Sequence, residues 1–200
     1  FCNGLKDKGL EAEVQGFTGL VLDPYFSASK IRWILENGAR SAAEKGELIA
    51  GNVDAYLLWR LTGGKSFCTD VSNASRTQLM DISCQAWSSR LCEIFSVPKS
   101  MLPEIRPSSG VFGVTKGLKF LPDGIPISGI AGDQQAALFG QTCFNVGESK
   151  CTFGTGSFLL MNTGEKLLRS RSGLLTTVAW QLSGEKTQFA LEGGAFICGA

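Results

Sequence analysis

The chain has 200 residues, enough for one full domain or parts of two; 44% of them are hydrophobic and 18% charged, as in ordinary globular proteins. The net charge is +1 and the basic residues are scattered, which excludes the concentrated basic face that binds nucleic acid or anionic membranes. The sequence contains no histidine, which excludes Ser-His-Asp catalysis and leaves proton transfer to Asp, Glu, Lys, Tyr or Cys, with carboxylates as the foremost candidates.

Three helices are predicted in the first half of the chain. Apolar residues recur at helical spacing over residues 27–37, where Ser27 is the predicted N-cap, and again over residues 52–61, which a Thr-Gly-Gly sequence closes. A third helix is predicted over residues 87–95, and two prolines prevent its continuation. Residues 98–110 are rich in Pro and Ser, so they are predicted to form a loop.

From residue 125 the pattern changes to strand, turn and helix. Residues 125–131 form a short apolar run that predicts a buried strand, Gly132 and Asp133 form the corner, and residues 134–141 are predicted to be a helix of small residues.

Two hairpins are predicted after this helix. Residues 150–162 form two β-rich runs around a Gly-Thr-Gly turn, and residues 174–181 and 187–191 form a second pair around Ser183 and Gly184. The alternation of helices and strands, followed by consecutive hairpins, indicates a mixed α/β architecture.

The turn Gly154-Thr155-Gly156 is a candidate phosphate-binding site. Flanking glycines let the backbone approach an anion closely, its N–H groups can converge on phosphate oxygens, and the threonine hydroxyl adds a further donor. The alternative is that these residues form a simple hairpin corner, as most such turns do.

Asp133 is the leading candidate for a catalytic base. It is predicted at the end of a strand, where ligands bind in α/β folds, and at the start of a helix, where the helix dipole favours an ionised carboxylate. Such a carboxylate can orient a substrate hydroxyl and accept its proton during phosphoryl transfer. The alternative is that Asp133 merely caps the helix.

Tyr25 follows Asp23 and Pro24 in a sequence that predicts a turn into the first predicted helix. Its ring could pack against the domain surface, or its hydroxyl could bind a ligand, and the residue pattern alone favours packing.

The seven cysteines are dispersed without a Cys-x-x-Cys pair, so neither a zinc site nor a disulfide framework is predicted, and a cytoplasmic protein with reduced thiols is expected. No run of about 18 apolar residues occurs, so no membrane-spanning segment is expected in this region. The first residues contain neither Met nor a secretory signal, and we expect the chain to come from a longer protein.

Several segments resemble one family, in order and at sensible spacing. Residues 25–37 match, at every required position, the first signature of the FGGY carbohydrate kinases. Other segments are similar to the members of this family that phosphorylate glycerol: residues 70–76, 129–140, 154–164, 173–177 and 190–193. The resemblance therefore covers nearly all of the chain.

The resemblance implies an actin-like, ribonuclease-H-like α/β fold with two domains that flank a deep cleft, both of them incomplete in this chain. Residues 1–141 would be the later part of the N-terminal domain, on the substrate side and with the catalytic aspartate. Residues 142–200 would begin the C-terminal domain with its phosphate-binding hairpin.

The resemblance also implies transfer of the γ-phosphate of ATP to the terminal hydroxyl of glycerol, which gives sn-glycerol 3-phosphate. Asp133 would be the catalytic base and, with Tyr25 and Gln134, would bind glycerol, while Phe158 would form an apolar wall behind the carbon chain. Residues 154–156 would hold the transferred phosphate, and Mg²⁺ would arrive with the nucleotide without a metal site of the protein's own.

The expected partners are therefore glycerol and ATP, with a homo-oligomer left open. The Arg-Glu clamp for glycerol, the first phosphate hairpin and the adenine site would lie outside this sequence, so this segment alone is expected to be inactive. Two alternatives remain at this level: a catalytically silent relative retained for binding, and an FGGY kinase for another sugar.

Overall fold

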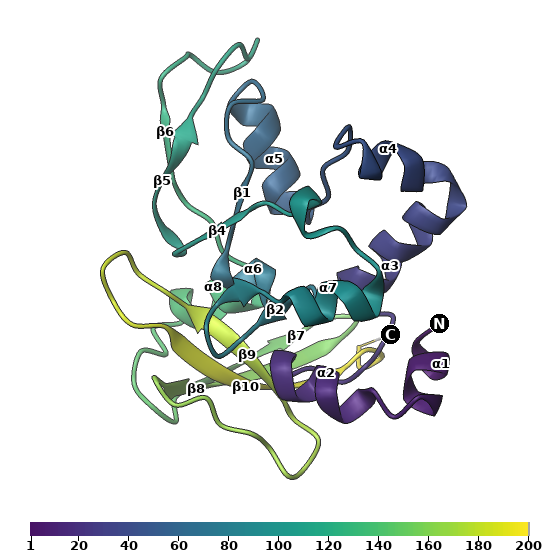
Figure 1. Cartoon of the computed structure of the whole chain (residues 1–200). Coiled ribbons are helices and arrows are strands. Elements are labelled where there is room, and N and C mark those ends of the chain that lie inside the picture. The colour runs from purple at the N-terminus through teal and green to yellow at the C-terminus, as the bar shows by residue number, and fades with distance from the viewer. Residues whose placement is uncertain (200) are drawn as a thin grey trace.

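The computed structural model of the chain describes residues 1–199 and contains helices and short strands (Figure 1). The helices are α1 (Cys2–Asp7), α2 (Glu11–Thr18), α3 (Ser27–Ile34), α4 (Arg40–Glu44), α5 (Val53–Leu61), α6 (Val71–Ala74), α7 (Ser89–Phe95) and α8 (Asp133–Gly140). A π-helical segment at Leu35–Ala39 and a 3-10 turn at Lys99–Met101 complete the helical structure of this region.

The strands form one larger sheet and several two-stranded pairs. They are β1 (Cys68–Asp70), β2 (Met80–Asp81), β3 (Ala86–Trp87), β4 (Glu104–Arg106), β5 (Ser109–Val114), β6 (Pro126–Gly129), β7 (Ser149–Phe153), β8 (Ser157–Gly164), β9 (Leu175–Trp180) and β10 (Gln188–Ala195). The larger sheet is antiparallel and has the strand order β7-β8-β10-β9, whereas β1 pairs with β4 in parallel.

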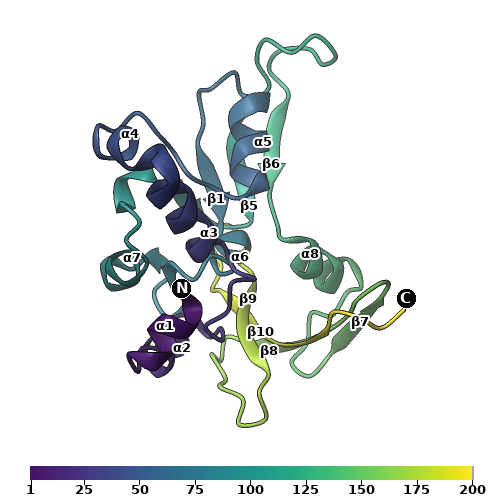
Figure 2. The same cartoon turned by 90° about the vertical axis from the view of Figure 1, so that its right-hand side faces the viewer.

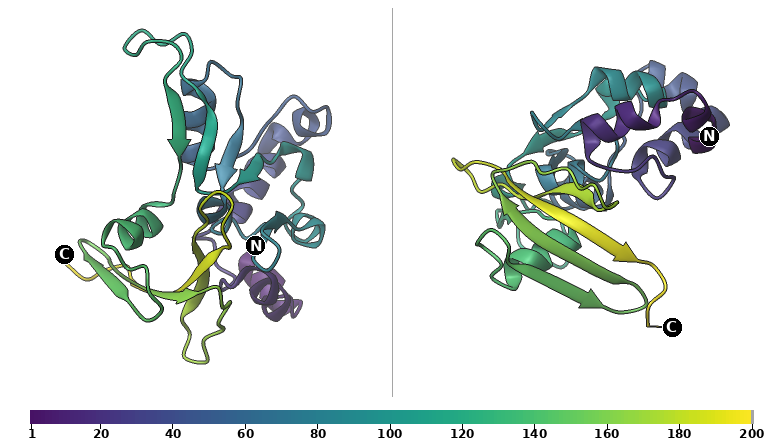
Figure 3. Two further views of the ribbon diagram at one scale, coloured as in Figure 1. Left: turned by 90° about the vertical axis from the view of Figure 1, so that its left-hand side faces the viewer. Right: turned by 90° about the horizontal axis from the view of Figure 1, so that it is seen from below.

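The helices of the first half lie on one side of the molecule and the four-stranded sheet on the other (Figures 1 and 3). The β5–β6 hairpin projects away from both, and α8 lies between this hairpin and the sheet (Figure 2). Leu138 of α8 is fully buried against Leu160 of β8 and Ala190 of β10. This contact fixes α8 on the sheet and so determines where the N-terminus of α8 lies.

A second contact joins the sheet to the first half of the chain. Val71 and Ala74 of α6 are buried in one cluster with Val178 of β9 and Phe189 of β10. The largest hydrophobic cluster lies elsewhere, among α2, α3 and α7, where Phe95 is completely buried. Buried apolar side chains thus hold both α6 and α8 against the sheet.

The predicted helix over residues 52–61 is confirmed as α5. The helix predicted over residues 27–37 is correct in its first part, but α3 gives way to the π-helical segment, where Gly38 has a φ of 117°. Ser27 is not the N-cap of α3, so this prediction is wrong: Phe26 occupies that position, and the Ser27 hydroxyl donates to Asn52 Oδ1 at 2.7 Å.

Two further predictions in this half are corrected. Residues 98–110 are not simply a loop, because they include the 3-10 turn, β4 and the start of β5. The strand β4 forms because Glu104 lies opposite Cys68 of β1, a pairing between distant segments that local composition does not reveal. The helix expected from residue 87 begins at Ser89, because Trp87 pairs with Met80 in the β2–β3 ladder.

The strand predicted at 125–131 exists as β6, but it is not buried. Three of its four residues are exposed. Among the described residues, β6 belongs to a two-stranded sheet with β5, so its other edge has no neighbouring strand there. Both predicted hairpins are confirmed as β7–β8 and β9–β10, and the helix predicted from residue 134 is α8, which begins one residue earlier. None of the described helices combines the length and apolar composition needed to cross a lipid bilayer.

Candidate active site

Asp133 is the first residue of α8, and Gly132 is the N-cap. The Gly132 N–H donates to Ser72 Oγ at 2.8 Å, and a β-carbon at Gly132 would come within 2.5 Å of Gln135 Oε1, so glycine fits this corner best. The Asp133 carboxylate accepts from the Gln134 backbone N–H at 2.8 Å and is exposed. Asp133 is therefore not the helix cap, and its negative charge lies where the helix dipole stabilises it.

A cavity of about 380 Å³ lies in front of this helix terminus. It brings together Tyr25, Asp133, Gln134 and Phe158, which come from three separate stretches of the sequence. Its remaining lining residues are Phe26, Ser27, Asn73, Arg76, Gly132, Gln135 and Glu192. Four of the predicted site residues thus share one cavity, with a carboxylate, an amide, a phenol and an apolar ring facing the same space.

Tyr25 lies in the predicted turn, where its backbone N–H donates to Asp23 Oδ1 at 2.7 Å. Tyr25 is 52% exposed, and its ring lies 5.1 Å, centroid to centroid, from the ring of Phe196, which is in turn 6.0 Å from the ring of Phe158. Tyr25 therefore both packs against aromatic side chains and lines the cavity. Phe196 lies beside both of the other rings and completes this aromatic group. The sequence did not distinguish it from the other phenylalanines, of which the chain has thirteen in all.

The turn of residues 154–156 connects β7 to β8 and does not itself line the cavity. The Gly154 N–H donates to the Gly156 carbonyl at 2.9 Å, which closes the turn, and Thr155 is exposed at its tip. A β-carbon at Gly156 would lie 2.9 Å from the ring of Phe158, so the turn is packed directly against a residue of the cavity wall. The turn and the cavity are therefore neighbours.

An ion pair that the sequence analysis missed also lines the cavity. Arg76, just after α6, contacts Glu192 of β10 through two pairs of atoms, Nη2–Oε1 at 2.9 Å and Nη1–Oε2 at 2.8 Å. Glu192 is buried, and the Arg76 guanidinium lies 5.2 Å from the centre of the Phe26 ring. In the sequence, Arg76 and Glu192 lie in the segments 70–76 and 190–193 that resemble the family, but no role was assigned to either residue.

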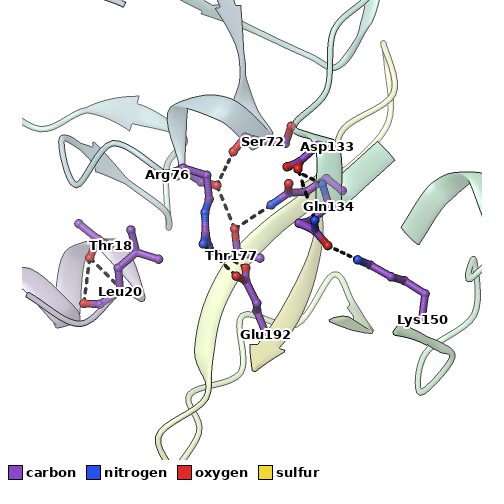
Figure 4. Close-up of polar contacts among 11 residues, drawn as sticks. Thr18, Leu20, Ser72, Arg76, Asp133, Gln134, Lys150, Thr177 and Glu192 are labelled. Carbon is purple, nitrogen blue, oxygen red and sulfur yellow. Dashed lines mark hydrogen bonds and ion pairs between the residues drawn. The ribbon is translucent and has the colours of Figure 1, made fainter. Parts of the chain in front are cut away.

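Lys150 of β7 is a second missed residue (Figure 4). Its ammonium donates to the side-chain oxygen of Gln134 and to Thr152 Oγ1, the latter at 2.8 Å. Burial lowers the pKa of Lys150, and the negative charges of Glu192 and Asp133 partly oppose this effect. The only signal in the sequence was a lysine at the start of a predicted strand.

No group of three or more acidic, cysteine or histidine side chains suited to a metal ion occurs in residues 1–199. In the cavity, Glu192 is engaged by Arg76, whereas the carboxylate of Asp133 is exposed. Mg²⁺ commonly binds through one or two carboxylates together with water and substrate phosphates. The exposed carboxylate of Asp133 is thus a candidate single ligand of the kind that such an ion uses.

Residues 1–140 match the N-terminal domain of the FGGY family of carbohydrate kinases, and the chain belongs to this family. Its relatives include the glycerol kinase of Bdellovibrio bacteriovorus, 60% identical over 201 residues, and that of Myxococcus xanthus, 56% identical over 202 residues. Both alignments take in 100% of this chain and 41% of the relative, so the chain spans about two fifths of these proteins.

Solved structures agree with this family. The crystal structure of Plasmodium falciparum glycerol kinase with ADP is 41% identical, with a TM-score of 0.92 over 96% of this chain and 39% of that one. A xylulose kinase from Lactobacillus acidophilus is 19% identical with a TM-score of 0.79, over 98% of this chain and 39% of that one, and shows the fold alone. The expected actin-like, ribonuclease-H-like α/β fold is thereby confirmed.

Proposed function

We propose that the protein containing this chain transfers the γ-phosphate of ATP to the terminal hydroxyl of glycerol and produces sn-glycerol 3-phosphate. The observation that carries the proposal is the convergence of Asp133, Gln134, Tyr25 and Phe158 on one cavity beside the 154–156 turn. The similarity to glycerol kinases along the full length of the chain supports glycerol over other substrates of the family.

Asp133 acts as the base in this proposal. Its carboxylate accepts the proton of the glycerol hydroxyl while the hydroxyl oxygen forms a bond to the γ-phosphorus and the bond from that phosphorus to ADP breaks. The position of Asp133 at the N-terminus of α8 orients the carboxylate, since it accepts from the backbone N–H of Gln134, the second residue of the helix. With no histidine in the chain, an aspartate is suited to this task.

Glycerol is held by polar groups on one side and an apolar wall on the other. Gln134 and Tyr25 supply an amide and a hydroxyl for the substrate oxygens, and the half-buried ring of Phe158 faces the carbon chain. A cavity of about 380 Å³ exceeds the volume of a three-carbon polyol, which leaves room for the phosphoryl group as well.

The nucleotide is bound beside the 154–156 turn. The exposed Thr155 hydroxyl and the glycine backbone are suited to the oxygens of the transferred phosphate. ATP, when bound, supplies the phosphoryl group, and Mg²⁺ accompanies its phosphates. Because the turn abuts Phe158, a phosphate there would lie next to the cavity that holds the substrate hydroxyl.

We further propose the division of the chain into residues 1–141, from the N-terminal domain, and residues 142–200, which begin the C-terminal domain. The junction lies directly after α8, whose N-terminal end carries Asp133. A cytoplasmic location is also proposed, and it is supported by seven cysteines that are all free thiols.

The test is an ATP-consumption assay of the full-length protein with glycerol, dihydroxyacetone, xylulose and gluconate side by side. We expect glycerol to be turned over with the highest kcat/KM. A preference for xylulose or gluconate would assign the protein to another substrate of the family, and no turnover of any of the four would contradict a kinase.

A further inference from the structure

The ammonium of Lys150 has three hydrogen-bond acceptors within reach. They are the side-chain oxygen of Gln134, Thr152 Oγ1 at 2.8 Å and the Phe158 carbonyl at 3.5 Å. A lysine has three N–H donors, so these contacts use all of them. Lys150 is also buried, with 6% of its surface exposed. The ammonium therefore has no donor left for a substrate or a phosphate, which argues against a direct catalytic role.

The contact determines how the amide of Gln134 is oriented. An ammonium can only donate, so the atom of the Gln134 amide that faces Lys150 must be the carbonyl oxygen. The NH₂ group is then turned the other way, and it lies 3.3 Å from Asp133 Oδ2. The reversed amide would place an NH₂ group against the ammonium and a carbonyl oxygen against the carboxylate, and both contacts are repulsive.

We propose that Lys150 is a positioning residue that holds the Gln134 amide with its NH₂ group toward the cavity, where it donates to an oxygen of the bound polyol. The inference rests on the proposed function, since it concerns the same substrate site. It assigns a role to a buried charge on β7 that makes no contact with the cavity itself.

The burial of this charge supports a role beyond filling space. An apolar side chain of similar length would fill the same volume without the cost of removing an ammonium from water. The nearby negative charges of Glu192 and Asp133 offset part of this cost. A methionine at position 150 would therefore preserve the packing while it removes the hydrogen bond to Gln134.

A double-mutant cycle in the full-length protein tests the proposal. Lys150→Met should raise KM for glycerol roughly tenfold and leave KM for ATP within about twofold, since a lost hydrogen bond to a neutral group corresponds to such a factor. In a Gln134→Met background the same change should have less than about a twofold further effect, because residues that act as a unit are not additive. Lys166→Met, at an exposed lysine after β8, is the matched control and should change neither constant.

Two results would overturn the proposal. If the increases in KM for glycerol caused by Lys150→Met and Gln134→Met multiply in the double variant, Lys150 does not act through Gln134. If Lys150→Met raises KM for ATP as much as KM for glycerol, Lys150 acts on the nucleotide.

Gln134→Glu provides a second test should Lys150→Met fail to fold. It keeps an oxygen for Lys150 but removes the NH₂ group, so KM for glycerol should rise at least tenfold, and an unchanged KM would refute the orientation argument. If the unmodified protein does not phosphorylate glycerol, the proposed function fails separately, and the cycle is measured with the polyol that it does phosphorylate.

Discussion

At the scale of single residues, Asp133 and Thr155 carry the two halves of the proposed reaction. Asp133 faces the cavity from the N-terminus of α8, and Thr155 stands at the exposed tip of the β7–β8 turn. Their side chains are expected to act on different substrates, so their replacement should have separable kinetic effects.

Replacement of Asp133 by Asn should lower kcat by on the order of 10²–10⁴, because a general base is worth about this factor. Asparagine keeps the shape and an acceptor for the Gln134 N–H, so ATP binding should be largely retained. Steady-state kinetics together with a nucleotide titration of the variant would measure both quantities. A kcat close to that of the unmodified protein would end the assignment of Asp133 as the base.

Replacement of Thr155 by Ala should weaken the handling of ATP by about 1.5–3 kcal/mol, the value of a hydrogen bond to a charged group. The kcat/KM for ATP measures this loss. Thr163→Ala is a suitable control, because Thr163 lies near the other end of β8 and donates to the Lys166 carbonyl at 3.0 Å, away from the turn. Equal ATP kinetics for both variants would show that the turn does not bind phosphate.

At the scale of secondary structure elements, the contact between α5 and β1 contains a poorly accommodated charge. Asp54 of α5 accepts from Thr69 Oγ1 of β1 at 2.6 Å, but its other carboxylate oxygen has no partner within the described part of the chain. Burial raises the pKa of Asp54 above its ordinary value. The ionised form is therefore disfavoured in the folded protein.

Asp54→Asn should therefore stabilise the protein at neutral pH. A carboxyl group whose pKa is raised on folding stabilises the folded protein below the unfolded-state pKa. This stabilisation is lost as the pH rises through the folded-state pKa, so the ionised form of Asp54 destabilises the fold. The advantage of the variant, measured as the thermal unfolding midpoint, should shrink as the pH is lowered from neutral toward the ordinary pKa of an aspartate. Lys116 lowers the pKa of Asp123, so Asp123→Asn is a control of opposite sign and should not stabilise.

The elements themselves were predictable where a strong local pattern coincided with the tertiary contacts. The apolar stripe of α5 and the Gly-Thr-Gly and Ser-Gly turns of the two hairpins predicted these elements correctly. The short strand β4 was not predictable, because its ladder depends on β1, which lies more than 30 residues earlier. Ser27 is not the cap because it is already the first helical residue: Phe26 has the extended backbone of an N-cap, and the Ser27 hydroxyl donates to Asn52 Oδ1.

At the scale of the whole molecule, one ion pair joins the two proposed domain segments. Among the salt bridges within residues 1–199, only that between Arg76 and Glu192 links residues 1–141 to residues 142–200. It lies in the wall of the cavity, with both side chains less than one-fifth exposed. The pair therefore contributes both to the contact between the segments and to the wall of the cavity.

Glu192→Ala should destabilise the full-length protein by about 2–5 kcal/mol, since it leaves a half-buried guanidinium without its partner. The midpoint of urea denaturation measures this loss. Glu165→Ala breaks the exposed contact with Lys186 and should cost no more than about 1 kcal/mol, which makes it the matched control. An equal, small effect of the two changes would show that the Arg76–Glu192 pair does not hold the segments together.

The sequence by itself determined the family, the α/β class and four of the residues that line the cavity, Tyr25, Asp133, Gln134 and Phe158, because the turns, helix starts and motifs that carry them are local. Only the tertiary structure revealed Arg76, Glu192, Lys150 and Phe196 as members of the site, since each meets its partner across a large separation in sequence or on a different element. The value of a buried charge depends on which opposite charge or acceptor it meets in the folded state, and a linear pattern does not contain that information.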